Sequence, residues 1–167
     1  MITRVRITVY KQFHKQVRRS ELRSIAKSAV TIGWNNLRNT TRVSIVIADD
    51  STIKRLNQNF RNSPEVTDVL AFPNYKLQDS QPVPLDDFPV FPKNYLDLGE
   101  IIISYPQVIR QLENSGNTRD SEFALLTAHG ILHLLGYDHD SFNNKNHMWL
   151  LQSKVLQSNG VEFNEPG

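Results

Sequence analysis

The stretch from His129 to His139 constrains this chain most, because three of its five histidines fall within these eleven residues, His-Gly-Ile-Leu-His-Leu-Leu-Gly-Tyr-Asp-His. On a helix, His129 and His133 would lie on one face, about 6 Å apart along the axis. Gly136 predicts a left-handed helix stop, which lets the chain double back and brings His139 toward the other two. Three imidazoles that leave a fourth position open are typical of a catalytic zinc site. The segment therefore predicts a helix that carries a metal centre.

Length and composition limit the class of protein. A chain of 167 residues is expected to form one domain, residues 1–167, around one core. Its apolar runs are too short to span a bilayer, and its N-terminus alternates like a strand and lacks the apolar region of a signal peptide. The absence of cysteine excludes disulfides and thiolate metal sites. A cytoplasmic protein with no membrane partner is the simplest interpretation.

Hydrophobic periodicity predicts an α+β fold, a mixed sheet of about four strands packed against about five helices, one of them resembling the histidine helix of zinc hydrolases. The strands are expected at residues 4–9, 43–47, 67–72 and 98–104. The helices are expected at residues 20–33, 53–61, 104–116, 118–136 and 143–158, with Ser20 and Thr118 as predicted N-caps and residues 49–52 as a turn and cap. Residues 73–97 hold five of the eight prolines and are interpreted as a long irregular loop within the domain.

Basic residues are concentrated at the start of the chain. Residues 1–42 hold ten of the nineteen Lys and Arg and one acid, a formal charge of +9, whereas the remainder holds nine bases and sixteen acids, −7. Such asymmetry is typical of a face that meets a polyanion, although a solvated strand and helix would look the same. The residues that could contact phosphates as a group are Arg4, Arg6, Lys15, Arg18, Arg19 and Arg23.

The spacing of the histidines also matches the extended zinc-protease pattern H-E-x-x-H-x-x-G-x-x-H. It departs from that pattern at Gly130, where proteases carry the glutamate that acts as general base. A metal ion could still lower the pKa of a bound water to about 7. A metalloprotease-like hydrolase is therefore kept only as an alternative.

Two further blocks accompany residues 129–139 along the chain. They are Leu56-Asn-Gln-Asn-Phe-Arg61 with Thr67-Asp-Val-Leu-Ala-Phe-Pro73, and Leu98-Gly-Glu-Ile101. Together the three blocks resemble H-G-x-L-H-L-x-G-[YF]-D-H, L-N-x-x-[YF]-R…T-D-V-L-S-F-P and L-G-D-I, the motifs of the YbeY family of single-strand-specific, metal-dependent endoribonucleases. Ala71 stands for the usual serine and Glu100 for the usual aspartate. The resemblance covers most of residues 45–156.

This resemblance implies an αβ fold in which the three histidines hold one zinc ion and Arg61 assists RNA cleavage. It further implies a role in ribosomal RNA processing, especially at the 3′ end of the small-subunit RNA, and in ribosome quality control. Single-stranded precursor rRNA, the small subunit and assembly factors are then the expected partners. Hydroxide and the 2′-hydroxyl of the substrate both remain possible nucleophiles. A non-catalytic assembly factor with a structural metal is the second alternative.

Asp138 lies directly before the third histidine. Its carboxylate could orient a metal-ligating histidine from outside the ligand set. It could equally cap the turn at Gly136 and Tyr137. The sequence leaves these two interpretations open.

Overall fold

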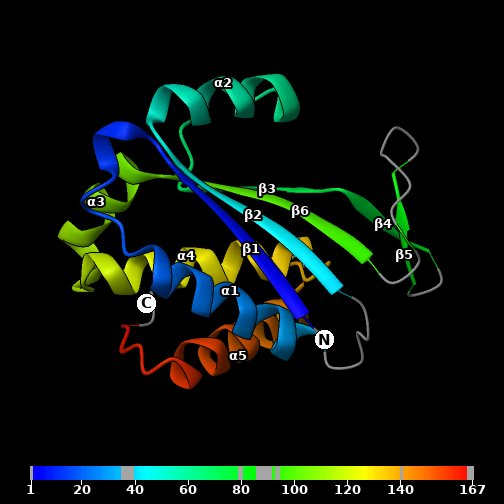
Figure 1. Ribbon diagram of the computed structural model, residues 1–167. Helices are drawn as coiled ribbons and strands as arrows, with labels where there is room; N and C mark the ends of the chain where they lie inside the picture. The colour runs from blue at the N-terminus through cyan, green and yellow to red at the C-terminus, as the bar shows by residue number, and fades with distance from the viewer. Residues whose placement is uncertain are drawn as a thin grey trace.

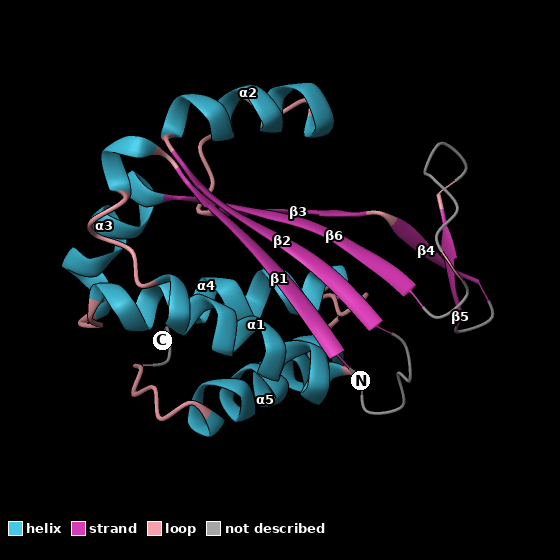
Figure 2. Cartoon of the chain, viewed as in Figure 1, coloured by secondary structure: helices cyan, strands magenta, loops and turns pink. Residues whose placement is uncertain are grey.

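A four-stranded mixed sheet forms the middle of the molecule (Figures 1 and 2). The computed structural model describes residues 2–34, 40–78, 81–85, 92, 95–139 and 141–164. The first three strands are parallel and the last is antiparallel to its neighbour, in the order β1 (Ile2–Val9), β2 (Thr40–Ala48), β6 (Tyr95–Ser104) and β3 (Val69–Pro73). Strand β3 is thus an edge strand of this sheet.

Helices lie on both faces of the sheet (Figure 2). One face is covered by α1 (Arg19–Gly33), α4 (Arg119–Leu134) and α5 (Phe142–Ser158). On the opposite face, α2 (Asp50–Arg61) is the one helix among the described residues, and α3 (Tyr105–Ser115) follows β6 at the end of the sheet. The short 3-10 helix η1 (Lys11–Phe13) follows β1. We call the face under α1, α4 and α5 the covered face, and the face that carries α2 the open face.

Side-chain alternation in the strands explains this division. In β1, Val5 and Ile7 pack against the main core and Val9 is buried in it, whereas Arg4 and Arg6 are exposed. A residue and its second neighbour share one face of a strand, so the arginines lie on the open face. The main core lies on the covered face, and a small second cluster lies between the sheet and α2: Ala48, Ile53, Leu70 and Ile102.

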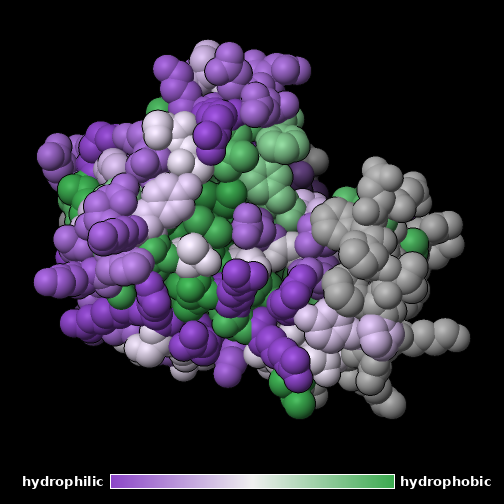
Figure 3. Space-filling model, turned by 45° about the horizontal axis from the view of Figure 1, so that its top comes forward, coloured by the Kyte–Doolittle hydropathy of each residue, from purple (hydrophilic) through white to green (hydrophobic). Residues whose placement is uncertain are grey.

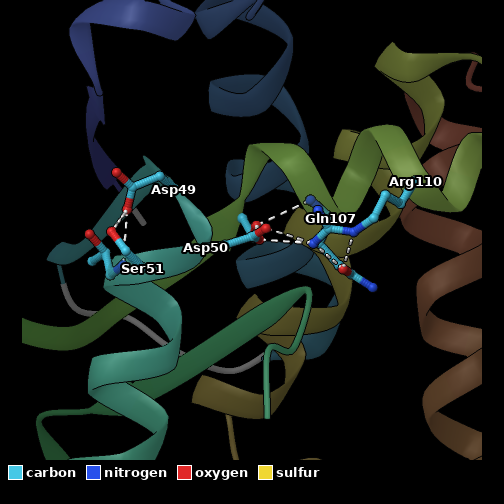
Figure 4. Close-up of polar contacts among 7 residues, drawn as sticks. Asp49, Asp50, Ser51, Gln107 and Arg110 are labelled. Atoms are coloured by element: carbon cyan, nitrogen blue, oxygen red, sulfur yellow. Dashed lines mark hydrogen bonds and ion pairs between the residues drawn. The ribbon is translucent and has the colours of Figure 1, made fainter. Parts of the chain in front are cut away.

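Polar contacts fix α2 at its N-terminus (Figure 4). The side chain of Asp49 caps the helix by accepting a hydrogen bond from the backbone N–H of Thr52, at 2.9 Å. Asp50 accepts a hydrogen bond from Ser104 Oγ at 2.6 Å and forms an ion pair with Arg110 of α3 at 2.8 Å. These contacts tie the start of α2 to the end of β6 and to α3.

Helix α4 is the central helix of the molecule. Twelve of its sixteen residues are buried, because it packs between the sheet, α1, α3 and α5. Thr118 caps it, as predicted, in a capping box whose other member is Ser121. Gly130 faces the sheet, and a Cβ atom there would lie 3.0 Å from Ile101 Cγ2 and 3.1 Å from Val69 Cγ2. A glycine at this position allows the helix to approach the sheet closely.

The α+β class with a four-stranded mixed sheet and five α-helices is confirmed. The predicted cap at Ser20 is wrong: α1 begins at Arg19, and its N-cap, Arg18, makes no side-chain capping bond.

Figure 3 shows hydrophobic side chains gathered on the face below α2, with hydrophilic side chains around them. None of the helices in the described part of the chain is long and apolar enough to cross a bilayer.

The interpretation of residues 73–97 as irregular throughout is also wrong. The segment contains the two-stranded sheet of β4 (Tyr75–Gln78) and β5 (Gln81–Pro84), and β6 already begins at Tyr95. The prolines argued against a strand in this segment, because proline cannot donate a backbone hydrogen bond. An edge strand tolerates proline, since not all of its N–H groups are paired. Residues 79–80, 86–91 and 93–94 of the predicted loop lie outside the described residues.

Candidate metal centre

Helix α4 and the turn after it bring the three predicted histidines together. His129 and His133 project from successive turns of α4, with their ring centroids 4.6 Å apart. The helix ends at Leu134, and Gly136 has a φ of 90°, the left-handed conformation that turns the chain back. The ring of His139 then lies 6.0 Å from that of His129 and 5.2 Å from that of His133. The predicted turn at Gly136 is therefore confirmed.

The three imidazoles fit one metal ion. Each offers one nitrogen, and these three atoms lie within 4.8 Å of one another, the one such cluster among the described residues. The Nε2 atoms of His129 and His133 are 3.0 Å apart, so both can reach an ion at the usual zinc–nitrogen distance of about 2.0–2.1 Å. His139 is the most exposed of the three, with 54% of its side chain accessible to solvent. The sequence contains no cysteine, so no thiolate could bind the ion in place of a histidine.

Burial keeps the two helical histidines in the form that binds metals. Loss of hydration, and to a smaller extent the neighbouring His129, lowers the pKa of His133 to about 4. Burial also lowers the pKa of His129, against the opposing effect of its hydrogen bond to Gln152. At neutral pH both rings are therefore neutral, and a neutral imidazole has a nitrogen lone pair free for a metal ion.

Gln152 of α5 orients the first histidine. Its side chain is 2% exposed, and its Oε1 lies 3.1 Å from His129 Nδ1, so the Nδ1–H donates to it and the Nε2 faces the other ligands. Our sequence reasoning missed this residue. The available signal was a polar side chain at an inward position of the last helix, one turn after Met148 and beside Leu151.

Two tyrosines hold the chain around the turn. The hydroxyl of Tyr75, from β4, donates to the carbonyl of Leu134 at the end of α4. The hydroxyl of Tyr137 donates to the carbonyl of Gly33 at 2.7 Å, which joins the turn to the end of α1. Burial raises the pKa of Tyr75 well above its ordinary value, so this hydroxyl keeps its proton. These bonds position the segment that carries His139.

Asp138 lies beside His139 rather than among the ligand nitrogens. Its Oδ1 accepts a hydrogen bond from the backbone N–H of His139 at 2.7 Å and is 3.9 Å from His139 Nδ1. Both side chains are more than half exposed. The local contact is that of a turn-stabilising carboxylate, and an orienting role toward His139 stays a prediction.

Arg61 lies at the C-terminal end of α2, the helix on the open face, whereas His129 and His133 belong to α4 on the covered face and His139 to the turn after α4. The side chain of Arg61 is exposed and forms no hydrogen bond or ion pair within the described part of the chain. The preceding Phe60 is 68% exposed and packs edge-on against Phe72 of β3, at 5.3 Å between centroids. Arg61 therefore sits next to the edge strand, and its catalytic role stays a prediction.

The structure divides the predicted basic group between two sides of the molecule. Arg4 and Arg6 lie on the open face, whereas Arg18, Arg19 and Arg23 belong to the start of α1, on the covered side. Arg18 is further engaged in ion pairs with Glu21 and Asp120. The last member, Lys15, is exposed in the turn between η1 and α1. The six residues thus do not share one surface.

Fold and site together define a class: an α+β protein with an open centre of three histidines, on a buried helix and the turn after it, that is compatible with one metal ion. The family described as endoribonuclease YbeY matches residues 7–160. This chain belongs to the YbeY family.

Individual relatives agree with this assignment. The endoribonuclease YbeY of Dehalococcoides mccartyi (strain CBDB1) is 41% identical over 81% of this chain and 80% of its own length. That of Caldicellulosiruptor bescii is 37% identical over 71% of this chain and 73% of its own length. The solution structure of TM1509 from Thermotoga maritima is similar to the fold, with a TM-score of 0.55, 26% identity and 99% of each chain covered.

Proposed function

We propose that this protein is a zinc-dependent endoribonuclease that cleaves single-stranded RNA in ribosomal RNA processing, at the 3′ end of the small-subunit RNA, and that it serves ribosome quality control. The convergence of His129, His133 and His139 on one point carries the proposal, together with membership of a family named for its endoribonuclease activity. Precursor rRNA and the small subunit or its assembly factors are the proposed partners, and the cytoplasm is the proposed location.

The chain's own residues divide the work. His129 and His133 would hold the metal as neutral ligands, with Gln152 fixing the tautomer of His129, and His139 would complete the set. Zinc bound there would supply Lewis-acid charge to the scissile phosphate and to the attacking oxygen. The guanidinium of Arg61 would stabilise the negative charge that develops on the nonbridging phosphate oxygens.

The missing protease base has a structural reason. Gly130 faces Ile101 and Val69 of the sheet, where a Cβ atom would already be tightly packed. A glutamate side chain there would have to displace these residues. This supports RNA cleavage over peptide hydrolysis, and it leaves hydroxide and the substrate's 2′-hydroxyl as the two possible nucleophiles.

A cleavage assay tests the proposal. A labelled RNA spanning the small-subunit 3′ end is incubated with zinc-loaded protein, as a single strand and as a duplex with its complement. We expect cleavage of the single strand alone, and its loss in His133→Ala. His14→Ala is the matched control, because His14 bonds to the carbonyl of Val9 outside the centre. If the RNA is bound tightly but stays intact, the protein is instead a non-catalytic assembly factor.

A further inference from the structure

A pocket of about 540 Å³ opens beside His129, between α3, α4 and α5. Its volume lies within the range of about 300–1,000 Å³ that is usual for small-molecule sites. Apart from His129 and Gln152, the residues that line it have no part in the function proposed above. The side chains that matter here are Asp68, Gln111, Glu122, Leu126 and Trp149.

The walls of the pocket suit a flat aromatic ring. Leu125 and Leu126 of α4 contribute apolar surface, and the half-buried Trp149 of α5 contributes an indole. A nucleobase has two apolar faces and a polar edge, and bases stack on aromatic side chains in most single-strand binding sites. Because Trp149 also borders the space next to His129 and His139, a base in this pocket would lie beside the metal centre.

The polar part of the lining combines the acceptors of Asp68, Glu122 and Gln111 with side chains that can donate as well as accept: Asn114, Ser115, Asn117 and Asn164. Gln111 donates through its Nε2 to Asp68 at 2.9 Å, whereas its Oε1 is buried and has no partner among the described residues. Glu122 is 5% exposed, and one of its oxygens accepts a hydrogen bond from Asn117 at 3.0 Å. A buried acceptor without a donor is costly, and a shift of the Gln111 side chain that turns this oxygen toward a donating ligand would relieve the cost.

The charge of the pocket decides which part of an RNA can enter. Among the described residues, its lining includes the carboxylates of Asp68 and Glu122 and no lysine or arginine. Such a lining repels a phosphate group and attracts the N–H groups of a base edge. Guanine offers two adjacent donors, N1–H and N2–H, whereas uracil offers one donor between two carbonyl oxygens. The pocket therefore matches guanine best and uracil worst.

We propose that this pocket binds one unpaired base of the RNA substrate, guanine in preference to uracil, next to the bond that is cleaved. The inference rests on the proposed ribonuclease function and adds a substrate preference to it. A base can enter only when it is neither paired nor stacked in a duplex, so the pocket would also select single-stranded RNA.

Binding is measured first, without cleavage. In Trp34→Phe protein, Trp149 is the one remaining tryptophan, and its fluorescence reports the pocket directly. Three pentaribonucleotides, UUGUU, UUIUU with inosine and UUUUU, are titrated in the presence of a chelator. We expect UUGUU to quench at a concentration about tenfold lower than UUUUU, with UUIUU between them because inosine lacks the N2 donors. Equal quenching by all three would overturn the proposal.

Variants connect the preference to the acceptors. Gln111→Leu removes the unpartnered oxygen, and Glu122→Gln keeps the volume but removes the charge. In each variant we expect UUGUU and UUUUU to quench at similar concentrations. Glu113→Gln is the control, because Glu113 is exposed and lies on α3, the helix of Gln111. This variant is expected to keep the preference for guanine. Thermal melting shows which variants fold. Retention of the full preference in folded Gln111→Leu and Glu122→Gln would contradict the proposal.

Cleavage of a longer single-stranded RNA by zinc-loaded protein separates this inference from the proposed function. Cuts next to guanines, lost in the two pocket variants, support both. Quenching by UUGUU without any cleavage supports the pocket and contradicts the ribonuclease. Cleavage at equal rates beside all four bases supports the ribonuclease and contradicts the pocket.

Discussion

The two faces of the sheet differ in how firmly they hold their side chains. On the covered face three helices pack over a continuous core, and two of the three histidines project from the buried α4. On the open face a single helix leaves a groove of about 500 Å³, with Arg42, Phe60 and Glu100 in its lining. Metal ligands need fixed geometry, whereas a long flexible substrate needs exposed surface. Two of the three histidines that could hold a metal ion thus project from the more tightly packed face, and the groove lies on the other.

Removing a ligand on the covered face should have the largest effect. In His129→Ala, we expect zinc uptake to fall and RNA cleavage to drop by at least about a thousandfold, the scale of the several kcal/mol that a metal ion supplies to a transition state. Elemental analysis and single-turnover cleavage measure the two losses. His147→Ala, an exposed histidine that packs on Tyr137, should change neither.

Arg61→Ala tests the open face. We expect a fall of about a hundredfold in kcat, because the guanidinium would act on the developing charge, and no change in zinc content. Arg55→Ala, an exposed arginine on the same helix, is the matched control. Equal rates for the wild type and Arg61→Ala would restrict the chemistry to the covered face.

Gln152→Ala tests how firmly the covered face orients its ligands. Loss of the bond to His129 Nδ1 should weaken zinc binding by about 10–100-fold, as is usual for residues that orient a metal-ligating histidine. Competition with a chromophoric chelator measures this affinity. Gln157→Ala on the exposed side of α5 should bind zinc as the wild type does. A wild-type affinity in Gln152→Ala would mean that the ring of His129 is oriented by its packing alone.

Glu100→Gln is expected to have the smallest effect, on stability alone. Burial on the open face raises the pKa of Glu100, and the charge of Arg6 only partly opposes this. Since the folded-state pKa lies above the unfolded one, the carboxyl stabilises the fold below about pH 4.5 and loses this contribution as pH rises through the folded value. Glu100→Gln should therefore melt slightly higher than the wild type at pH 7 and like it at pH 4. Glu113→Gln should show no such difference.

Local rules predicted much of this structure from the sequence. The cap at Thr118, the cap within residues 49–52 and the turn at Gly136 depend on neighbouring residues alone. All three are confirmed, although Asp49 caps a helix that begins at Asp50 and not at residue 53. The histidine cluster was predictable for the same reason, because a helix and one tight turn fix its spacing.

Contacts between distant segments were not predictable in this way. Gln152 meets His129 only when α5 docks on α4, and the reason for Gly130 is visible only against Ile101 of the sheet. The basic residues at the start of the chain appeared to be one cluster, but Arg4 and Arg23 lie on different sides, because a strand and a helix in separate layers present them.

Stepwise zinc loading tests the central claim most directly. The protein is stripped with a chelator, reloaded with increasing zinc, and assayed at each step on the single-stranded small-subunit RNA. If His129, His133 and His139 form a catalytic centre for one ion, cleavage is absent after stripping, rises linearly with zinc and saturates at one ion per chain. Cleavage that survives complete stripping, or a fully loaded protein that leaves the RNA intact, would contradict it.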